Sequence, residues 1–374
     1  MKYFSFFLAV ISTSLMLGQQ MKLTKGMVID SVAVNDSIAE TYSLYLPINF
    51  TTDRTWPILF IFDPEKRGRT VNQLFRQPAE EQGYILAASN HINKDSTLLS
   101  NVKVATRLVN GVLNLLPVDM DQIYAASLAE GARVASVMPA VIKNLTGVIA
   151  VGDTWINTDF IKKGANFSFV GLAGYNDYRK FLIGETAVYL SKSGMPATTY
   201  FFDGGREWPG IEVISNALGT FTLQSISKGR RIADLSLTEE IYQNELQYAE
   251  QLRGSMQFYK AYQLLEKMST KYAMYGKQEE LEQKMKDIKK SSVFRTQRLS
   301  SITELLLQRK STGTSICTFL MKTYILLILR IWAGGMVKLR NWKSYKIVRR
   351  RQKPKWHSGY RASCRIWHLI LLMI

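Results

Sequence analysis

The stretch from residue 123 to residue 136 constrains the fold of this chain more than any other. It reads Ile-Tyr-Ala-Ala-Ser-Leu-Ala-Glu-Gly-Ala-Arg-Val-Ala-Ser. A short apolar run, 123–126, leads into a turn of small residues, and a helix-like segment follows. Small residues at 131, 132, 135 and 136 allow that helix to approach the strand closely. The pattern therefore predicts a buried strand, a tight turn and a helix that packs back onto the strand.

The rest of the chain up to about residue 230 alternates in the same way. Continuous apolar runs such as 57–62 are typical of strands buried on both faces of a sheet, and helical patterns separate them. Repeated β-α-β units of this kind predict an α/β fold, with a mostly parallel sheet and helices on both faces. The alternating segments 27–34 and 41–46, with a turn at 35–37, predict an antiparallel hairpin before it.

Binding sites of parallel sheets lie at the carboxyl ends of the strands. The loops to inspect are therefore those after residues 62, 89, 126, 172 and 202. The helix pattern at 71–82 contains Pro78, which we expect to kink the helix or to open a second one.

The formal net charge of +18 is concentrated at one end of the chain. Residues 311–374 contain 13 Lys and Arg and no Asp or Glu, so the first 310 residues hold 48 − 13 = 35 basic and 30 acidic residues, a net of +5. Their charges are interspersed, which is typical of a solvated surface. We therefore expect no nucleic-acid partner for this part of the chain.

Cysteine and histidine are scarce. Both cysteines lie in 311–374, and His91 is the one histidine before residue 311. The first 310 residues can thus hold neither a disulfide framework nor a thiolate nucleophile. A metal site built on imidazole is excluded there too, and we expect no cofactor.

Residues 1–18 have the pattern of a secretory signal peptide. Lys2 precedes a short apolar run, and Gly18 is a small residue at the expected cleavage point. The run is too short to span a membrane. The expected location is the periplasm or the outside of the cell, with the α/β domain covering residues 19–230.

Residues 231–310 differ from the preceding domain. Strand patterns stop, and 237–310 is charged and helical, with a turn near Gly276. The segment weakly resembles one tetratricopeptide-like hairpin. One hairpin cannot form a solenoid, so we expect these helices to pack against the preceding domain.

The tail, 311–374, has an aberrant composition. It holds four of the seven Trp residues besides its 13 basic ones, and no acid. A frameshift in the gene would give such a composition while leaving the first 310 residues coherent. The alternative is a basic segment that binds nucleic acid or anionic lipid. Lys322 and Arg330 bracket its one strongly apolar run, so we expect no stable membrane span.

Four segments together resemble the secreted α/β-hydrolase-like proteins of the bacterial esterase and polyester-depolymerase type. They are Phe-Asp-Pro at 62–64 followed by Gly68, Ala-Ser-Asn at 88–90, the stretch 123–133, and Phe-Asp-Gly-Gly-Arg-Glu-Trp-Pro at 202–209. The resemblance covers about 35–230 and implies an α/β-hydrolase fold with a Ser-Asp-His triad. The stretch 123–133 then corresponds to the turn that carries the nucleophile, with the pattern Gly-x-Ser-x-Gly.

The resemblance also implies which residues stand at the triad positions. Ser127 takes the place of the first glycine, Ala129 that of the nucleophile, and Gly131 that of the last glycine. Arg206 stands where the family has the histidine base, and Asp177 where it has the acid. Because a guanidinium stays protonated, it cannot act as a base. We expect Asp177 to form an ion pair with Arg206.

A second register makes Ser127 the nucleophile, between Ala125 and Ala129. A base is still missing, because His91 follows the strand that carries part of the oxyanion loop in the family. The same resemblance implies pocket residues: the backbone N–H of Glu130 as an oxyanion donor, and Asn90, His91 and Trp208 on the rim.

These observations favour a catalytically inactive hydrolase-like protein that binds an unidentified small molecule or protein. The alternative is an active serine ester or acyl hydrolase that uses Ser127. A third hypothesis is an interaction protein that acts through the helices of 231–310. A fluorophosphonate probe distinguishes the first two hypotheses.

Overall fold

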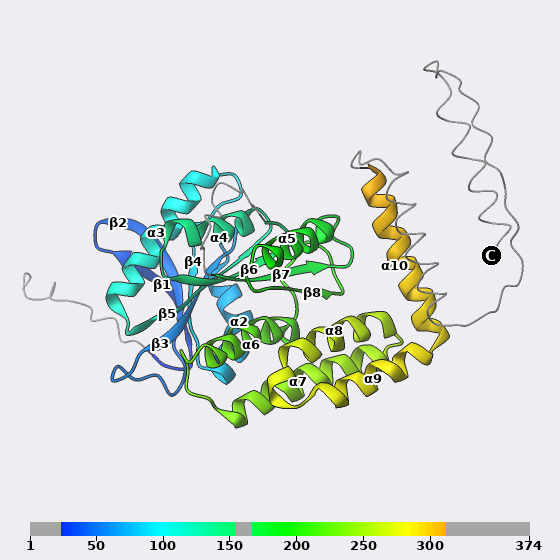
Figure 1. Ribbon diagram of the computed structural model, residues 1–374. Coiled ribbons are helices and arrows are strands. Elements are labelled where there is room, and N and C mark those ends of the chain that lie inside the picture. Colours follow the sequence, from blue (N-terminus) through cyan, green and yellow to red (C-terminus); the bar gives the residue numbers. More distant parts are fainter. Residues whose placement is uncertain (1–23, 155–166, 312–374) are drawn as a thin grey trace, which may run out of the picture. The chain divides into compact units, whose positions relative to one another are not determined.

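The computed structural model describes residues 24–154 and 167–311 (Figure 1). The expected signal peptide and the tail beyond Ser311 lie outside these residues. Within the described ranges, eight strands form one sheet in the order β1-β2-β4-β3-β5-β6-β7-β8. The strands are β1 (Val28–Asn35), β2 (Ile38–Tyr45), β3 (Trp56–Phe62), β4 (Ile85–Ser89), β5 (Val118–Leu128), β6 (Leu145–Val151), β7 (Ser168–Gly174) and β8 (Ala197–Phe202).

The strand directions confirm the predicted fold class. β1 and β2 form the expected antiparallel hairpin, and β2 also runs antiparallel to β4. From β4 through β3 to β8, every neighbouring pair is parallel. This order, with β2 reversed, is that of the α/β-hydrolase fold.

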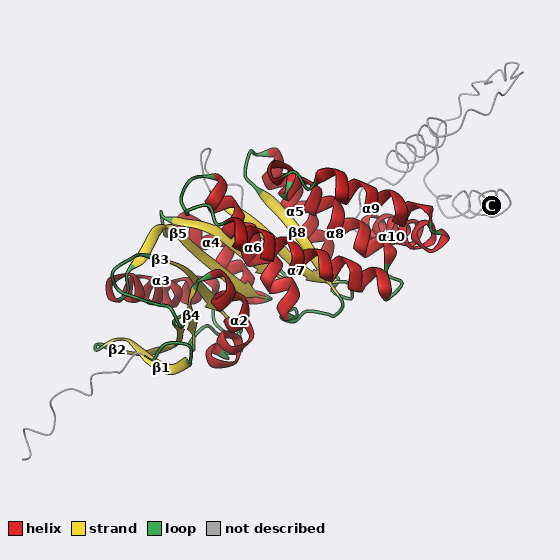
Figure 2. Cartoon of the chain, turned by 90° about the horizontal axis from the view of Figure 1, so that it is seen from below, coloured by secondary structure: helices red, strands yellow, loops and turns green. Residues whose placement is uncertain are grey.

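Helices cover both faces of the sheet. α2 (Gly68–Gln82) and α6 (Ile211–Ser227) lie on one face, and α3 (Leu98–Leu115), α4 (Glu130–Val141) and α5 (Lys180–Lys192) lie on the other (Figures 1 and 2). Successive side chains of each strand enter different cores. In β5, for example, Tyr124 and Ala126 pack with α6, whereas Ile123 and Ala125 pack with α3 and α4.

Pro78 does not open a second helix, which was one of the two expected outcomes, because α2 runs from Gly68 to Gln82 as one helix. Phe75, Pro78 and Ala79 are all buried on the side that faces the sheet. Packing of this apolar face stabilises the helix despite the hydrogen bond that proline cannot donate. Gly83 ends the helix in a left-handed conformation, with φ of 69°.

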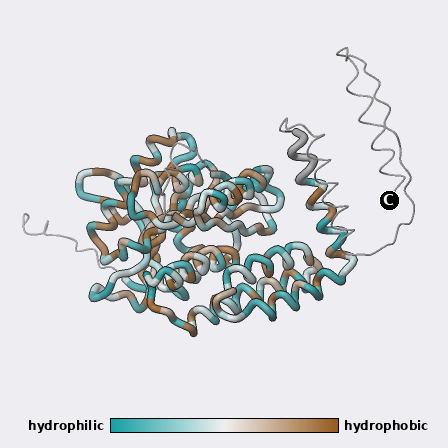
Figure 3. The backbone as a smooth tube through the Cα atoms, viewed as in Figure 1, coloured by the Kyte–Doolittle hydropathy of each residue, from teal (hydrophilic) through white to brown (hydrophobic). Residues whose placement is uncertain are grey.

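Four further helices follow the sheet: α7 (Leu235–Gly254), α8 (Phe258–Lys271), α9 (Gln278–Lys290) and α10 (Ser292–Ser311). α7 packs against α6, and α8 contacts β8. Their apolar faces join the core on the α2–α6 side of the sheet, and Figure 3 shows hydrophobic and hydrophilic segments alternating along α7 and α9. The sheet and α7–α9 therefore belong to one compact unit, which extends to Leu307.

A buried ion pair helps to join α7 to α8. Lys271 donates to the fully buried carboxylate of Glu245 at 2.9 Å, and the hydroxyl of Tyr272 donates to the same oxygen at 2.9 Å. In residues 24–154 and 167–311, no helix has the length and apolar character required to cross a bilayer.

Candidate functional site

The turn between β5 and α4 has an unusual backbone. Ala129 follows the last residue of the strand and has φ of 52° and ψ of −124°, and the helix begins at Glu130. A non-glycine residue in this region stores about 1–3 kcal/mol of strain. The strand-turn-helix of α/β-hydrolases holds its nucleophile in such a strained turn, which presents the side chain to the cleft. In this chain the residue with these backbone angles is Ala129, whose side chain is a methyl group.

Gly131 shows how closely strand and helix approach. A Cβ atom on Gly131 would lie 2.7 Å from Ser127 Oγ and 2.8 Å from the backbone oxygen of Phe62. Both distances are shorter than a carbon atom and an oxygen atom in van der Waals contact can reach. The packing therefore requires glycine at 131, which fits the register with Ala129 at the nucleophile position.

Ser127 lies inside the fold rather than in a cleft. Its side chain is fully buried in β5, and Oγ donates a hydrogen bond of 2.7 Å to the backbone oxygen of Phe62. His91 lies beside β2, where Nε2 is 3.4 Å from Thr41 Oγ1. Asn90 donates to Thr41 and Asp30 on the same side. The structure therefore brings neither Asn90 nor His91 into the cavity beside Ala129.

That cavity has a volume of about 660 Å³. Three of the predicted site residues line it together with Ala129, namely Glu130, Arg206 and Trp208. Trp208 Nε1 donates to the buried Asp63 at 2.7 Å, and its ring packs edge-on against Phe75. Leu128 and Glu207 also line it, and the remaining walls come from the β3–α2 loop and the first turns of α2: Pro64, Glu65, Arg67, Thr70, Val71 and Leu74.

Asp177 does not form the expected ion pair with Arg206. One of its oxygens, Oδ1, accepts the backbone N–H of Arg179 at 2.8 Å. The other, Oδ2, is buried and has no hydrogen-bond partner among the described residues. The expectation is wrong because the Arg206 guanidinium extends past Asp177 to two other carboxylates.

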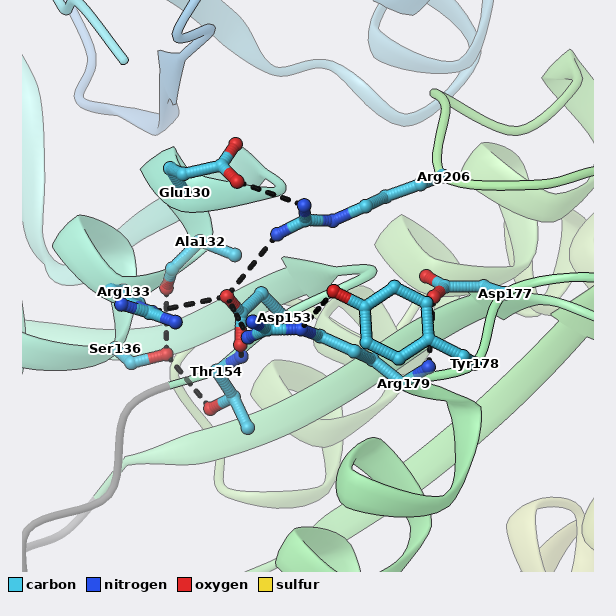
Figure 4. A network of polar contacts seen from close by, with 10 residues as sticks. All are labelled: Glu130, Ala132, Arg133, Ser136, Asp153, Thr154, Asp177, Tyr178, Arg179 and Arg206. Atoms are coloured by element: carbon cyan, nitrogen blue, oxygen red, sulfur yellow. Dashed lines mark hydrogen bonds and ion pairs between the residues drawn. The ribbon is translucent and has the colours of Figure 1, made fainter. Parts of the chain in front are cut away.

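The first of these carboxylates is Asp153, which the sequence analysis missed (Figure 4). It is fully buried, and its Oδ2 is 3.0 Å from Arg133 Nε and 3.3 Å from Arg206 Nη2. Arg179 donates to the same oxygen, and Oδ1 accepts the backbone N–H of Thr154 at 2.8 Å. One buried carboxylate thus fixes three arginines from three different loops and helices.

The second carboxylate is Glu130, the first residue of α4. Its Oε1 accepts from Arg206 Nη1 at 2.8 Å. Partial burial raises the pKa of Glu130, but a backbone hydrogen bond and the cations Arg206 and Arg133 outweigh it and hold this pKa below its ordinary value. Glu130 therefore stays ionised and is ion-paired with Arg206 where both residues line the cavity.

The groups beside this cavity are poorly suited to proton transfer. Arg206 is doubly ion-paired and cannot accept a proton. Ala129 offers no nucleophile. Within residues 24–154 and 167–304, no three His, Cys, Asp or Glu side chains lie together as metal ligands.

No protein-family model and no curated protein matches this chain. Solved structures of esterases are similar to it at low identity. The esterase of the archaeon Pyrobaculum calidifontis is 13% identical over 57% of this chain and 89% of its own, with a TM-score of 0.45. An esterase B from Lactobacillus rhamnosis is 15% identical over 61% and 96%, with a TM-score of 0.43. S-formylglutathione hydrolase from Staphylococcus aureus is 11% identical over 52% and 95%, with a TM-score of 0.42. At these identities the similarity concerns the fold alone.

Proposed function

We propose that this protein is a catalytically inactive α/β-hydrolase that binds a small molecule or a protein segment in the cavity beside Ala129. It acts in the periplasm or outside the cell, where the signal pattern of residues 1–18 directs it. The observation that carries the proposal is the backbone of Ala129, which keeps the strained turn of a nucleophile without a nucleophilic side chain.

Acyl transfer requires a hydroxyl or thiol, a base within hydrogen-bond reach and a group that orients the base. The first requirement fails at Ala129. The second fails at Arg206, whose guanidinium is committed to Glu130 and Asp153. Two requirements lost at separate positions support the loss of hydrolysis more strongly than one would.

Ser127 does not replace the missing nucleophile. Its Oγ is buried, hydrogen-bonded to Phe62 and walled off by Gly131. A substrate carbonyl would have to enter the space between β5 and α4 to reach it. The geometry therefore disfavours the active hydrolase with Ser127 as the nucleophile.

Binding does not need the triad. Enzymes that lose all their triad residues keep the oxyanion hole and the substrate pocket. Here the cavity of about 660 Å³ remains open beside Ala129, and its size falls within the range of small-molecule sites. Its wall combines Trp208 with both acidic and basic groups, which suits a ligand that carries polar groups of its own.

Two measurements on the full chain test the loss of hydrolysis. We expect neither labelling by a fluorophosphonate probe nor hydrolysis of p-nitrophenyl butyrate. The matched variants are Ser127→Ala and Ser136→Ala, since Ser136 is also hydrogen-bonded inside the protein. Labelling that disappears in Ser127→Ala and persists in Ser136→Ala would refute the proposal.

The proposed location has a separate test. Expression in a bacterial host and mass determination of the periplasmic fraction should give an N-terminus just after Gly18. Recovery of the protein with residues 1–18 attached, in the cytoplasm, would contradict it.

A further inference from the structure

A second cavity, of about 670 Å³, lies at the edge of the sheet formed by β8. Its walls come from α5, β8, α6, α8 and the turn after α8, and it shares no residue with the cavity beside Ala129. Its volume is in the range of sites that enclose a small organic molecule. This site is independent of the function proposed for the first cavity.

The walls of this edge cavity are largely apolar. Ala187 and Val188 of α5, Leu223 of α6 and Met274 in the turn after α8 all line it. Val188 and Met274 are 55% and 70% exposed, although both are large apolar side chains. Exposed apolar groups around a concave surface mark a place where an apolar ligand is stabilised by leaving water.

One lysine in this apolar setting lacks a counter-charge. Lys267 of α8 donates to the backbone oxygen of Thr199 and, at 3.2 Å, to its hydroxyl. An ammonium group has three N–H donors, so one donor remains. No carboxylate in the described part of the chain forms an ion pair with Lys267. One turn later, by contrast, Lys271 is paired with Glu245.

The charges around Lys267 come from three helices. α5 contributes Lys192 to the cavity, and α8 contributes Glu266 and Lys271, whereas the α6 wall is uncharged. Glu245 of α7 does not line the cavity but also acts on the charge of Lys267. Burial lowers the pKa of Lys267 to about 8, against the opposing influence of Glu245 and Glu266. The two acids thus do not compensate for the burial of this cation.

We propose that the edge cavity binds a small amphiphile with an apolar body and a carboxylate head, and that the carboxylate pairs with Lys267. The apolar walls account for the body, and the remaining N–H of the ammonium accounts for the head. A ligand without a charge would leave Lys267 without an anionic partner, and a ligand without an apolar body would leave Val188 and Met274 in water. A carboxylate bound there restores the counter-charge that the protein lacks.

The test uses the full chain and two fluorescent probes, cis-parinaric acid and its alcohol, cis-parinaryl alcohol. Lys267→Met should weaken binding of the acid by roughly tenfold or more, because a charge-assisted hydrogen bond is lost. It should change binding of the alcohol by less than about twofold, because methionine preserves the apolar volume. Lys286→Met, an exposed lysine on α9, is the matched control and should change neither.

A second variant keeps the test decisive if Lys267→Met folds poorly. Val188→Glu, at the exposed rim, should weaken binding of the acid more than that of the alcohol through repulsion. In the unmodified protein, affinity for the acid should also begin to fall above about pH 8, as the Lys267 ammonium loses its proton.

Three results would overturn the proposal. One is equal weakening of acid and alcohol in Lys267→Met, which would show an effect of shape alone. Another is acid binding that is insensitive to both Lys267→Met and Val188→Glu. The third is acid binding that depends on Arg206→Gln instead, which would place the probe beside Ala129.

Discussion

Replacing Asp153 by asparagine is expected to destabilise the protein by about 3 kcal/mol. The carboxylate is fully buried, and Oδ2 is the shared acceptor for Arg133, Arg179 and Arg206. Asparagine keeps the shape and the bond from Thr154, but it removes the charge that holds three cations together.

The magnitude follows from burial. Removing one partner of a buried ion pair costs about 3–5 kcal/mol, because the other charge stays buried and unpaired. The three arginine side chains are between 24% and 40% exposed, so part of their charge returns to water when Asp153 is lost. We therefore take the lower end of this range.

Equilibrium unfolding in urea measures this difference. A thermal melt should show a fall in Tm of roughly 6–12 °C, at about 2–4 °C per kcal/mol for a domain of this size. Asp203→Asn is the matched control, because Asp203 forms an exposed ion pair with Lys260 and should cost less than about 1 kcal/mol. If both variants cost the same small amount, Asp153 does not anchor the site, and the account of the three arginines is wrong.

Three further predictions concern the turn, the packing and the edge lysine. The double variant Ala129→Ser and Arg206→His supplies a nucleophile and a base, so it should hydrolyse p-nitrophenyl esters, which Ala129→Ser alone should not. Equal hydrolysis rates for the single and the double variant would contradict this prediction. Gly131→Ala should destabilise the protein by about 1–3 kcal/mol in urea unfolding, whereas Gly184→Ala, which meets no atom within 4 Å, should be stabilising by up to about 1 kcal/mol. The pKa of Lys267 is about 8 in the folded state and near 10.5 in the unfolded state, so the unfolded state binds more protons between these pH values. The free energy of unfolding should therefore rise from pH 8 to pH 10, and urea unfolding at both pH values should show that Lys267→Met lacks this rise.

The sheet could be predicted because local sequence patterns identify its strands. Continuous apolar runs such as Trp56–Phe62 and Ser168–Gly174 indicate burial on both faces, and short polar loops separate them from the helices. The errors arise where distant parts of the chain decide the outcome. Pro78 stays inside α2 because an apolar face packs on the sheet, which no local pattern reports.

The centre of the site could not be predicted in this way. Asp153 is the second residue after β6, so its place at the carboxyl edge of the sheet was a usable signal, but the loop after residue 151 was not among those singled out from the sequence. Of the three arginines that it binds, Arg133 lies 20 residues before it, and Arg179 and Arg206 lie 26 and 53 residues after it. Only the folded topology brings these side chains to one carboxylate.

The difference in length between arginine and histidine explains why Asp177 is left unpaired. A Cβ atom built on Gly152 would lie 2.9 Å from Asp177 Oδ2 and 3.1 Å from Arg206 Cγ, so the acid lies beside the stem of this arginine. A histidine ends its side chain near the middle of an arginine side chain, where the buried Arg206 Nε also lacks a partner among the described residues. The guanidinium continues beyond this point to Glu130 and Asp153. The unpaired oxygen of Asp177 therefore lies where an imidazole nitrogen would need an acceptor, which is why the double variant with Arg206→His is expected to work where Ala129→Ser alone fails.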